Sequence, residues 1–379
     1  MTERIPFNKP FIVGKELFYI SQAVLEGQLA GNGAFTRRCE AWLERTTGAA
    51  RVLLTTSCTA ALEMAAMLCD VEEGDEVILP SFTFVSTANA FALRGARLRF
   101  VDIRPDTLNL DEEQLEAAIG PRTRGIVPVH YAGVGCAMDR ILEIADHHDL
   151  WVVEDAAQAV NSNYRGRPLG TFGQLGCFSF HETKNFICGE GGALVVNDPA
   201  WIERAEILRE KGTNRSQFLR GDVDKYSWVD VGSSYVPSEL NAAFLYAQLE
   251  EAAEITHKRA AIFSRYRVGL APLEEAGLAT LPTVPVDTTC NGHMFYLIAE
   301  SAVDRNRILH GLEKEGIQAV FHYVPLHSSP MGRAMGYAPD DLPVTEELAA
   351  RLIRLPCYFE LSADEQDRVI EAVLDLVEP

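Results

Sequence analysis

The sequence has few basic residues for its size. Among 379 residues, 34 are Lys or Arg and 54 are Asp or Glu, so the formal charge is −20 at pH 7. Such a chain is a poor candidate for nonspecific binding to nucleic acid, which needs cations to neutralise phosphates, or to an anionic membrane surface. If its ligand is an anion, the binding site must supply positive charge of its own.

Long apolar runs and paired cysteines are also missing. The first residues, Met1 to Pro6, lack the apolar core of a signal peptide, and no window approaches the ~18 apolar residues of a membrane helix. The eight cysteines are scattered, without a C-x-x-C pair. In a chain of this length, such cysteines are typical of reduced thiols in a cytoplasmic protein. We therefore expect neither a disulfide framework nor a cysteine-bound metal.

From Arg51 onward, short apolar segments alternate with amphipathic ones. Strands are expected at 51–55, 76–79, 97–101, 125–129, 151–154, 175–178 and 193–196. This order predicts an α/β fold in which a large, mostly parallel sheet carries helices on both faces. The rest of the chain mixes strands and helices, as in a small α+β C-terminal domain. We place the domain boundary near residue 250, giving units 1–250 and 251–379.

Local signals predict where several elements begin and end. Thr36 is expected to cap a helix, and Ser238 to open a long helical stretch that runs to Gly269. The C-terminal part is expected to hold strands at 293–299 and 317–322 and helices at 304–315, 346–353 and 364–376. The last helix opens with Ser362-Ala-Asp-Glu365, which has the capping-box pattern.

Side chains that could bind a ligand lie at the ends of four of the expected strands, where open parallel sheets bind their ligands. They are the hydroxyl residues of 55–60, Phe84, the acid Asp155 and Lys184, which lies beside a glycine-rich turn at 189–192. Taken alone, each has an ordinary structural explanation, such as a helix cap, a core aromatic or a surface charge. Together they supply a phosphate cradle, a ring-stacking aromatic, a carboxylate and an amine, which is the set that pyridoxal 5′-phosphate (PLP) requires. A nicotinamide site is disfavoured because no G-x-G-x-x-G follows the first strand.

The segments around these groups resemble those of the DegT-type sugar-nucleotide aminotransferases. They are GAFTRRC at 33–39, TFVSTANA at 83–90, FSFHETKN at 178–185, EKGTNR at 210–215 and VFHYVPLH at 320–327. The resemblance extends over essentially the whole chain. It implies the fold-type I architecture of PLP-dependent transferases, PLP as cofactor and a homodimer with its sites at the subunit interface. It also implies L-glutamate and a dTDP-keto-sugar as substrates.

The same resemblance assigns roles to individual residues. Those implied to contact PLP are Cys58, Thr59, Ala60, Phe84, Asp155, Gln158, Ser179, Lys184 and Ser234. Lys184 would form a Schiff base with PLP, and Asp155 would pair with the ring nitrogen. Ser234, in Gly232-Ser-Ser-Tyr235, occupies the place of an asparagine that many members extend to the phosphate of the partner subunit. The residues implied to contact substrate are Asn32, His322, Lys211 and Arg215.

Three alternatives remain open at this point. The first is amination of another keto-sugar nucleotide, with a gluco product or at C3. The second is PLP-dependent sugar dehydration, but there a histidine replaces the lysine, and Lys184 argues against it. The third is a regulatory PLP-binding scaffold, which would lose the sugar loops, whereas 31–33 and 321–323 are intact.

Overall fold

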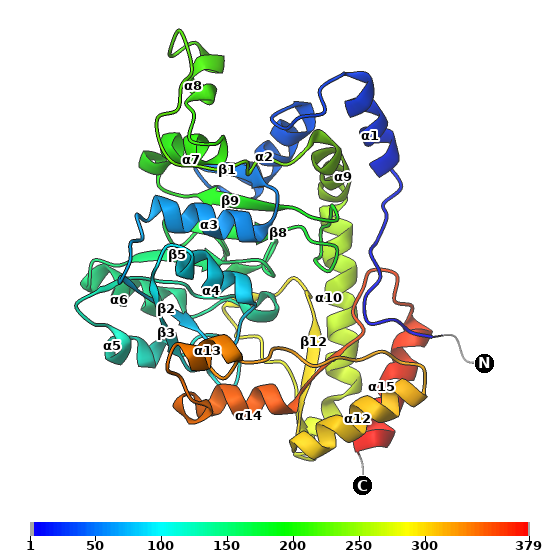
Figure 1. Cartoon of the computed structure of the whole chain (residues 1–379). Helices are drawn as coiled ribbons and strands as arrows, with labels where there is room; N and C mark the ends of the chain where they lie inside the picture. The colour runs from blue at the N-terminus through cyan, green and yellow to red at the C-terminus, as the bar shows by residue number, and fades with distance from the viewer. Residues whose placement is uncertain (1–3, 378–379) are drawn as a thin grey trace.

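A seven-stranded sheet forms the centre of the larger part of the molecule. The computed structural model describes residues 4–377, and its chain path is shown in Figure 1. The strands are β1 (Arg51–Thr55), β2 (Glu76–Pro80), β3 (Arg97–Val101), β4 (Thr123–Ile126), β5 (Trp151–Asp155), β8 (Leu175–Ser179) and β9 (Gly192–Val196). Their order is β1-β9-β8-β5-β4-β2-β3, and only β9 is antiparallel to its neighbours. The predicted α/β architecture with a mostly parallel sheet is confirmed.

Helices cover both faces of this sheet. One face packs against α3 (Cys58–Leu68), α4 (Val85–Ala92) and α7 (Ile202–Arg209), and the other against α2 (Ala34–Thr47), α6 (Met138–His147) and α9 (Glu239–Glu250). The strands alternate between the two hydrophobic clusters, because successive side chains point to opposite faces. In β5, for example, Val152 enters one cluster and Val153 the other.

Smaller elements complete this part of the chain. The helix α1 (Glu16–Leu25) contacts α9, α5 (Leu115–Ala118) contacts α6, and α8 (Arg215–Arg220) contacts α7. Figure 1 shows α8 projecting from the end of the molecule beyond α7. A short sheet joins β6 (Asn163–Tyr164) to β7 (Arg167–Pro168) and to β11 (Thr288–Thr289) from the C-terminal part.

The C-terminal part has its own sheet and its own core. The strands β10 (Ala279–Thr280), β12 (Phe295–Ala299) and β13 (Leu352–Leu355) form an antiparallel sheet. The helices of this part are α10 (Ala252–Gly269), α11 (Ala271–Glu275), α12 (Ala302–Lys314), α13 (Pro330–Ala334), α14 (Pro343–Arg351) and α15 (Ala363–Val377). Buried residues of α10, α11, α12 and α15 form a cluster with this sheet that also takes in Ile5, whose amide donates to the Gly316 carbonyl oxygen at 3.0 Å. The N-terminal arm therefore packs on the C-terminal part.

The strand register explains why one edge of the large sheet collects polar groups. Gly192, the first residue of β9, lies opposite both Thr55 of β1 and Ser179 of β8. Since β9 is antiparallel to both, β1 and β8 end at the same edge as the parallel strands β5 and β2. Residues that follow these four strands are thus brought together, as the sequence predicts.

Two predicted features of helix ends have different outcomes. The capping box of α15 is confirmed, because the Ser362 amide donates to Glu365 at 2.8 Å and the Glu365 amide donates to the Ser362 hydroxyl at 3.2 Å. The prediction that Thr36 caps a helix is wrong, since α2 already begins at Ala34. The first amides of α2 are instead satisfied by the buried carboxylate of Glu239, from another helix.

Other predicted boundaries need correction. The helical stretch from Ser238 is broken at Glu251 into α9 and α10. The strand expected at 125–129 lies at 123–126, and 317–322 makes only isolated bridges. The helix expected at 346–353 ends at Arg351, because the next residues form β13 and bury Leu352, Ile353 and Leu355 in the core.

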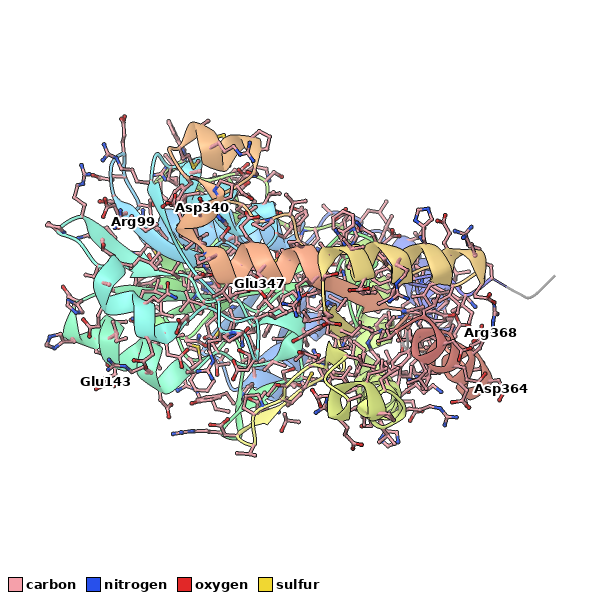
Figure 2. The ribbon with its side chains drawn as sticks, turned by 90° about the horizontal axis from the view of Figure 1, so that it is seen from below. Arg99, Glu143, Asp340, Glu347, Asp364 and Arg368 are labelled. Atoms are coloured by element: carbon pink, nitrogen blue, oxygen red, sulfur yellow. The ribbon has the colours of Figure 1, made fainter. Side chains whose placement is uncertain are left out.

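Charged side chains cover the outside of the molecule. Figure 2, viewed from below, shows Arg99, Glu143 and Asp364 at its margin. Among residues 4–377, no helix is both long and apolar enough to cross a membrane.

Candidate active site

A cavity of about 540 Å³ opens at the carboxyl edge of the large sheet. It is lined from both parts of the chain, because residues 293–294, residues 322–323 and Arg354 of β13 line it together with the strand ends. The predicted site residues that line it are Cys58, Thr59, Phe84, Asp155, Gln158, Ser179, Lys184 and His322. Residues separated by more than 260 positions in the sequence are therefore brought into one site.

The turn between β1 and α3 forms an anion cradle. Ser57 caps α3, and its hydroxyl oxygen accepts a hydrogen bond from the Ala60 amide at 3.1 Å. The Ala60 amide is thus already used, whereas no partner is seen for the Cys58 and Thr59 amides within the described chain. Free amides at a helix N-terminus bind phosphate well. Gly192 permits this turn, since a Cβ there would lie 2.4 Å from the Cys58 nitrogen.

Ser179 forms another part of the wall beside this cradle. It ends β8, is buried and lines the cavity. Its hydroxyl oxygen accepts a hydrogen bond from the His181 amide at 3.4 Å. The hydroxyl hydrogen remains available to an anion in the cavity.

Asp155 is a buried carboxylate held in a fixed orientation. Only 5% of the residue is exposed. One carboxylate oxygen accepts from the Thr87 hydroxyl at 2.7 Å, and the other accepts from the Ala157 amide at 3.1 Å. The Thr87 hydroxyl also lies 2.7 Å from that of Thr83. Asp155 forms no ion pair within residues 4–377, so its charge is available to a cationic group in the cavity.

Lys184 follows β8 and contributes an amine to the same cavity. Burial lowers its pKa below the usual 10.5, because water is excluded from around the charged form. Its Nζ atom has no hydrogen-bond partner or counterion within the described chain. A lowered pKa increases the fraction of neutral amine, which is the form that acts as nucleophile and base.

Two aromatic residues and a glutamine define the shape of the cavity. Phe84 lies at the start of α4 and is 58% exposed, an unusual state for a large apolar side chain at a cavity wall. The ring centroid of Tyr323 lies 6.4 Å away. The Gln158 side chain is fixed, because its oxygen accepts from the Ala132 amide at 2.6 Å and its nitrogen donates to the Tyr323 hydroxyl at 3.1 Å.

Two histidines in the wall are uncharged at neutral pH. Burial lowers the pKa of His293 and of His322 well below 6.5, and the nearby cations Lys184 and Arg354 lower both further. The His322 Nδ1 lies 3.0 Å from the Tyr131 hydroxyl, and the His293 Nδ1 lies 2.9 Å from the Asn185 side-chain oxygen. They can orient a ligand by hydrogen bonds without adding charge.

Sequence reasoning did not single out several residues of this cavity. They are Phe7, Thr87, His293, Tyr323 and Arg354. A signal existed for Arg354, which is the only charge in the apolar run Leu352-Ile-Arg-Leu355. Phe7 gave no signal, because its place in the site depends on how the N-terminal arm packs.

Five predicted residues do not line the cavity: Ala60, whose amide donates to the Ser57 hydroxyl, and four others that lie around Glu210. Ser234 is exposed, and its backbone bridges Glu210. Lys211 is exposed and follows Glu210 directly, and the Arg215 guanidinium lies 3.9 Å from the Glu210 carboxylate. Asn32 donates to the same carboxylate. These residues therefore form a second group, the Asn32–Ser234 cluster (Asn32, Lys211, Arg215 and Ser234), near the end of α7.

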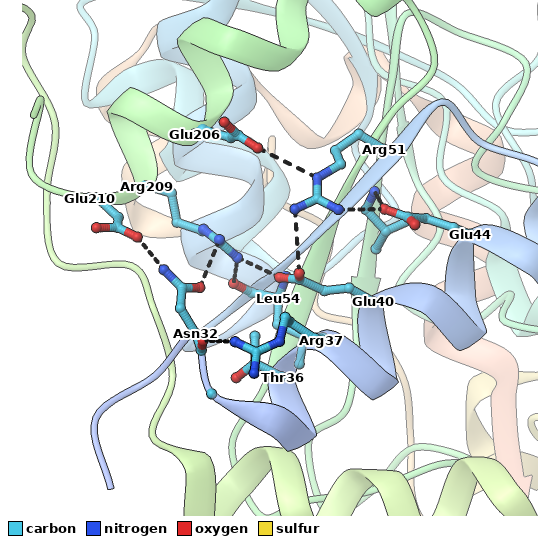
Figure 3. A network of polar contacts seen from close by, with 12 residues as sticks. Asn32, Thr36, Arg37, Glu40, Glu44, Arg51, Leu54, Glu206, Arg209 and Glu210 are labelled. Carbon is cyan, nitrogen blue, oxygen red and sulfur yellow. Dashed lines mark hydrogen bonds and ion pairs between the residues drawn. The ribbon is translucent and has the colours of Figure 1, made fainter. Parts of the chain in front are cut away.

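An ionic network surrounds Asn32, one member of the Asn32–Ser234 cluster, as Figure 3 shows. The Arg209 guanidinium donates to the Glu40 carboxylate at 2.6 Å and to the Asn32 side-chain oxygen at 2.8 Å. Arg51 lies between Glu40, Glu44 and Glu206 at 3.6, 3.0 and 3.6 Å. Removing one partner of such a buried pair leaves an uncompensated charge. The network thus fixes the loop at Asn32 against α7.

Comparison with known proteins places the whole chain in one group. A model described as the DegT/DnrJ/EryC1/StrS aminotransferase family matches residues 12–374. The spore coat polysaccharide biosynthesis protein SpsC of Bacillus subtilis is 34% identical, over 98% of this chain and 97% of its own length.

Solved structures with a similar fold support the same family. DesV of S. venezuelae has a TM-score of 0.89 and 32% identity, covering 100% of both chains. Spr1654 from Streptococcus pneumoniae, named as a sugar aminotransferase and solved in a PLP form, has a TM-score of 0.91 and 27% identity, covering 99% of both chains. A PMP form of the same protein has a TM-score of 0.92.

Proposed function

Because this chain belongs to the DegT/DnrJ/EryC1/StrS aminotransferase family, it is a PLP-dependent sugar aminotransferase of fold-type I, and we propose its two substrates. The acceptor is dTDP-4-keto-6-deoxy-D-glucose and the donor is L-glutamate. The products are dTDP-4-amino-4,6-dideoxy-D-galactose and 2-oxoglutarate. The observation that supports the acceptor is the nearly full-length resemblance to the transaminase of that reaction, the WecE type.

The residues of the cavity fit PLP. The cradle at Cys58 and Thr59 has free amides for the phosphate, and the exposed ring of Phe84 offers a stacking face. Asp155 is a buried carboxylate without a counterion, which suits a protonated ring nitrogen. We propose that these residues hold PLP together with Gln158, Ser179 and Lys184.

When bound, PLP supplies a carbonyl that exchanges amino groups and a ring that accepts the electrons released as a proton leaves carbon. Lys184 provides the neutral Nζ that holds the cofactor, accepts the α-proton of the donor and returns it at another carbon. Asp155 keeps the ring nitrogen protonated through a charge-assisted hydrogen bond. Thr87 and the Ala157 amide hold that carboxylate in place. Ping-pong kinetics follow, since one site serves both substrates in turn.

The sugar nucleotide brings a diphosphate to a protein of charge −20. Local cations must therefore receive it, and we propose Lys211 and Arg215 of the Asn32–Ser234 cluster. They lie away from the cavity of their own chain, so this role requires a second copy. A homodimer, in which Ser234 also extends to the partner's cofactor phosphate, would provide that arrangement.

The likeness to SpsC, a spore coat polysaccharide biosynthesis protein, supports a place for the product in polysaccharide synthesis. The product is an amino sugar activated by a nucleoside diphosphate. The reaction class that consumes such a compound is glycosyl transfer, in which the diphosphate is the leaving group.

The test is incubation of the purified enzyme with L-glutamate and a panel of keto-sugar nucleotides, followed by NMR of the product. We expect an axial 4-amine of galacto configuration. An equatorial gluco product, or amination at C3, would contradict the proposed acceptor and move the chain to a sister activity. Loss of the sugar hydroxyl without amination would indicate a dehydratase, and no turnover with any member would favour a regulatory scaffold.

A further inference from the structure

His293 lies just before β12 and presents an unpaired nitrogen to the cavity. The residue is 5% exposed and lines the cavity wall. Its Nδ1 atom lies 2.9 Å from the Asn185 side-chain oxygen, whereas its Nε2 atom has no hydrogen-bond partner within residues 4–377. The chemistry proposed above gives this atom no role. Since buried polar atoms are nearly always paired, Nε2 points to a ligand from outside the chain.

The hydrogen bonds of two asparagines determine which nitrogen of His293 carries a hydrogen. The Asn291 side-chain nitrogen donates to the carbonyl oxygens of Gln158 and Val160, at 2.9 and 2.8 Å. The Asn291 side-chain oxygen accepts from the His293 amide at 3.0 Å. The Asn185 side-chain nitrogen donates to the Asn291 carbonyl oxygen at 3.1 Å. Carbonyl oxygens only accept, so neither side-chain amide can be reversed.

The Asn185 side-chain oxygen is therefore the atom that faces His293, and the His293 Nδ1 must carry a hydrogen and donate it. Burial and the nearby charge of Lys184 keep the pKa of His293 well below 6.5. A neutral imidazole has one ring hydrogen, so the Nε2 atom carries a lone pair and accepts. The Arg259 guanidinium donates to the His293 carbonyl oxygen at 2.7 Å, which holds this acceptor in place.

Neighbouring groups of the cavity wall present hydrogens instead. The Tyr131 side chain is fully buried, and the His322 Nδ1, at 3.0 Å, is the partner of its hydroxyl in the described chain. Tyr131 therefore donates, since its hydrogen would otherwise be unpaired, and neutral His322 carries its own hydrogen on Nε2. The Tyr323 hydroxyl accepts from Gln158 at 3.1 Å, which leaves its hydrogen for a ligand. His293 is thus an acceptor among donors.

A sugar hydroxyl is the ligand group that suits this acceptor. The phosphates and the two carboxylates of L-glutamate are anions without a hydrogen to donate. The amino nitrogen of the donor bonds to the cofactor during the exchange and is held there. The sugar hydroxyl next to the carbonyl must lie close to Lys184, because the carbonyl carbon receives the amine. Asn185, the residue after Lys184, binds His293 directly, so His293 lies in the same part of the cavity.

We propose that the Nε2 atom of His293 accepts a hydrogen bond from the sugar hydroxyl on the carbon next to the carbonyl. Asn185 and Asn291 are positioning residues that fix the tautomer of His293. The hydrogen bond orients the carbonyl carbon beside Lys184. It also selects against sugars that are deoxy at that position, because they leave the buried Nε2 atom unpaired. This inference rests on the proposed function.

The first test compares two unreactive ligands that differ in one hydroxyl. They are dTDP-D-fucose, which has a hydroxyl in place of the amine of the proposed product, and its 3-deoxy analogue. Calorimetry on the PLP-loaded wild type should show about 10- to 100-fold tighter binding of dTDP-D-fucose. His293→Leu should bind both ligands alike, and His293→Gln, whose side-chain oxygen can accept, should recover part of the preference. His257→Leu, at an exposed histidine of α10, is the matched control.

The second test reads the tautomer directly. Nitrogen NMR of the histidine-labelled, PLP-loaded enzyme should show a His293 signal with a hydrogen on Nδ1, none on Nε2 and no titration around neutral pH. The signal is assigned by its loss in His293→Gln. Asn185→Ala removes the acceptor of the Nδ1 hydrogen and should give a mixture of the two tautomers.

An unchanged preference in His293→Leu would overturn the proposal, even where the affinity for both ligands falls, because a merely structural role acts on both alike. A hydrogen on Nε2 in the wild type would overturn it too, and this result needs no variant that folds. If the wild type aminates no keto-sugar nucleotide, the proposed function fails. If it does so and His293→Leu keeps the preference, only this inference fails, so the two failures are distinguishable.

Discussion

At the scale of single residues, the site depends on Lys184 being half-buried and without a counterion in the described chain. Burial disfavours its charged form, so its pKa lies below 10.5 and neutral amine is available. The same burial has a consequence for stability. The amine keeps its ordinary pKa in the unfolded chain. At a pH below the folded pKa, Lys184 is charged in both states, and its charge destabilises the folded apoprotein. That penalty disappears as the pH rises towards 10.5.

We therefore predict that Lys184→Ala abolishes turnover and leaves the fold intact. At pH 7 the apo variant should be no less stable to urea than wild type, and any advantage should shrink as the pH rises. Borohydride reduction of the PLP-loaded wild type, followed by peptide mapping, should label Lys184. Lys225→Ala, which removes an exposed lysine, is the control. A label on any other lysine would contradict the assignment.

Sequence patterns located the residues that follow strands, but not those that face them from elsewhere. Phe84, Asp155 and Lys184 could be found because the carboxyl ends of neighbouring strands meet at one edge. Phe7 and Arg354 reach the same cavity from the arm and from β13. Their place depends on how the C-terminal part packs on the sheet, which no local pattern encodes.

At the scale of elements, the N-terminus of α2 is capped by a residue that is far away in the sequence, Glu239 of α9. The Glu239 carboxylate accepts from the amides of Gly33, Phe35 and Thr36 at 2.9, 2.8 and 3.2 Å, and from the Thr36 hydroxyl. A Cβ at Gly33 would lie 2.4 Å from the Glu239 carboxyl carbon. This close approach joins α2 to α9, next to the loop that carries Asn32.

We predict that Glu239→Gln destabilises the protein by about 1–3 kcal/mol, because an amide cannot accept all of these hydrogen bonds and one donor is left unpaired. Urea unfolding monitored by circular dichroism measures the change. Glu300→Gln removes an exposed carboxylate and should have little effect. An unfolding free energy equal to wild type in Glu239→Gln would show that water or another group replaces the carboxylate.

The elements that the sequence predicted well are those with strong local signals. The strands of the large sheet are short apolar runs between turns, and most were placed within one or two residues. The start of β13 was predicted wrongly, since the expected helix at 346–353 takes in Leu352 and Ile353. Its strand state is decided by pairing with β12, in which Ile353 lies opposite Leu297. This pairing joins segments that are distant in the sequence, so no local pattern predicts it.

At the scale of the whole molecule, the two groups of predicted site residues do not meet within one chain. The cavity holds Lys184, whereas the Asn32–Ser234 cluster lies near the end of α7. Large apolar side chains are exposed nearby, including Leu219 at 63% and Trp228 at 78%. An exposed apolar patch of this kind is typical of a surface that another protein covers. These features support the proposed homodimer.

A test of that arrangement combines two damaged chains. One carries Lys184→Ala and the other carries Lys211→Ala with Arg215→Ala, and the two are co-expressed with different tags and purified as a mixed dimer. At low sugar-nucleotide concentration each variant alone should be nearly inactive. In the mixed dimer, one of the two sites combines an intact Lys184 with an intact cluster from the other chain. We predict recovery of about half of the wild-type rate per dimer, because a symmetric dimer contains two such sites.

The comparison is decisive because folding defects act within a chain and mixing cannot repair them. If Lys211 and Arg215 served the site of their own chain, every site in the mixed dimer would lack either the lysine or the cluster. The rate would then equal the mean of the two variants. A mixed dimer of Lys184→Ala with wild type should give about half of the wild-type rate and serves as the calibration. Failure to isolate any mixed dimer would contradict the dimer itself.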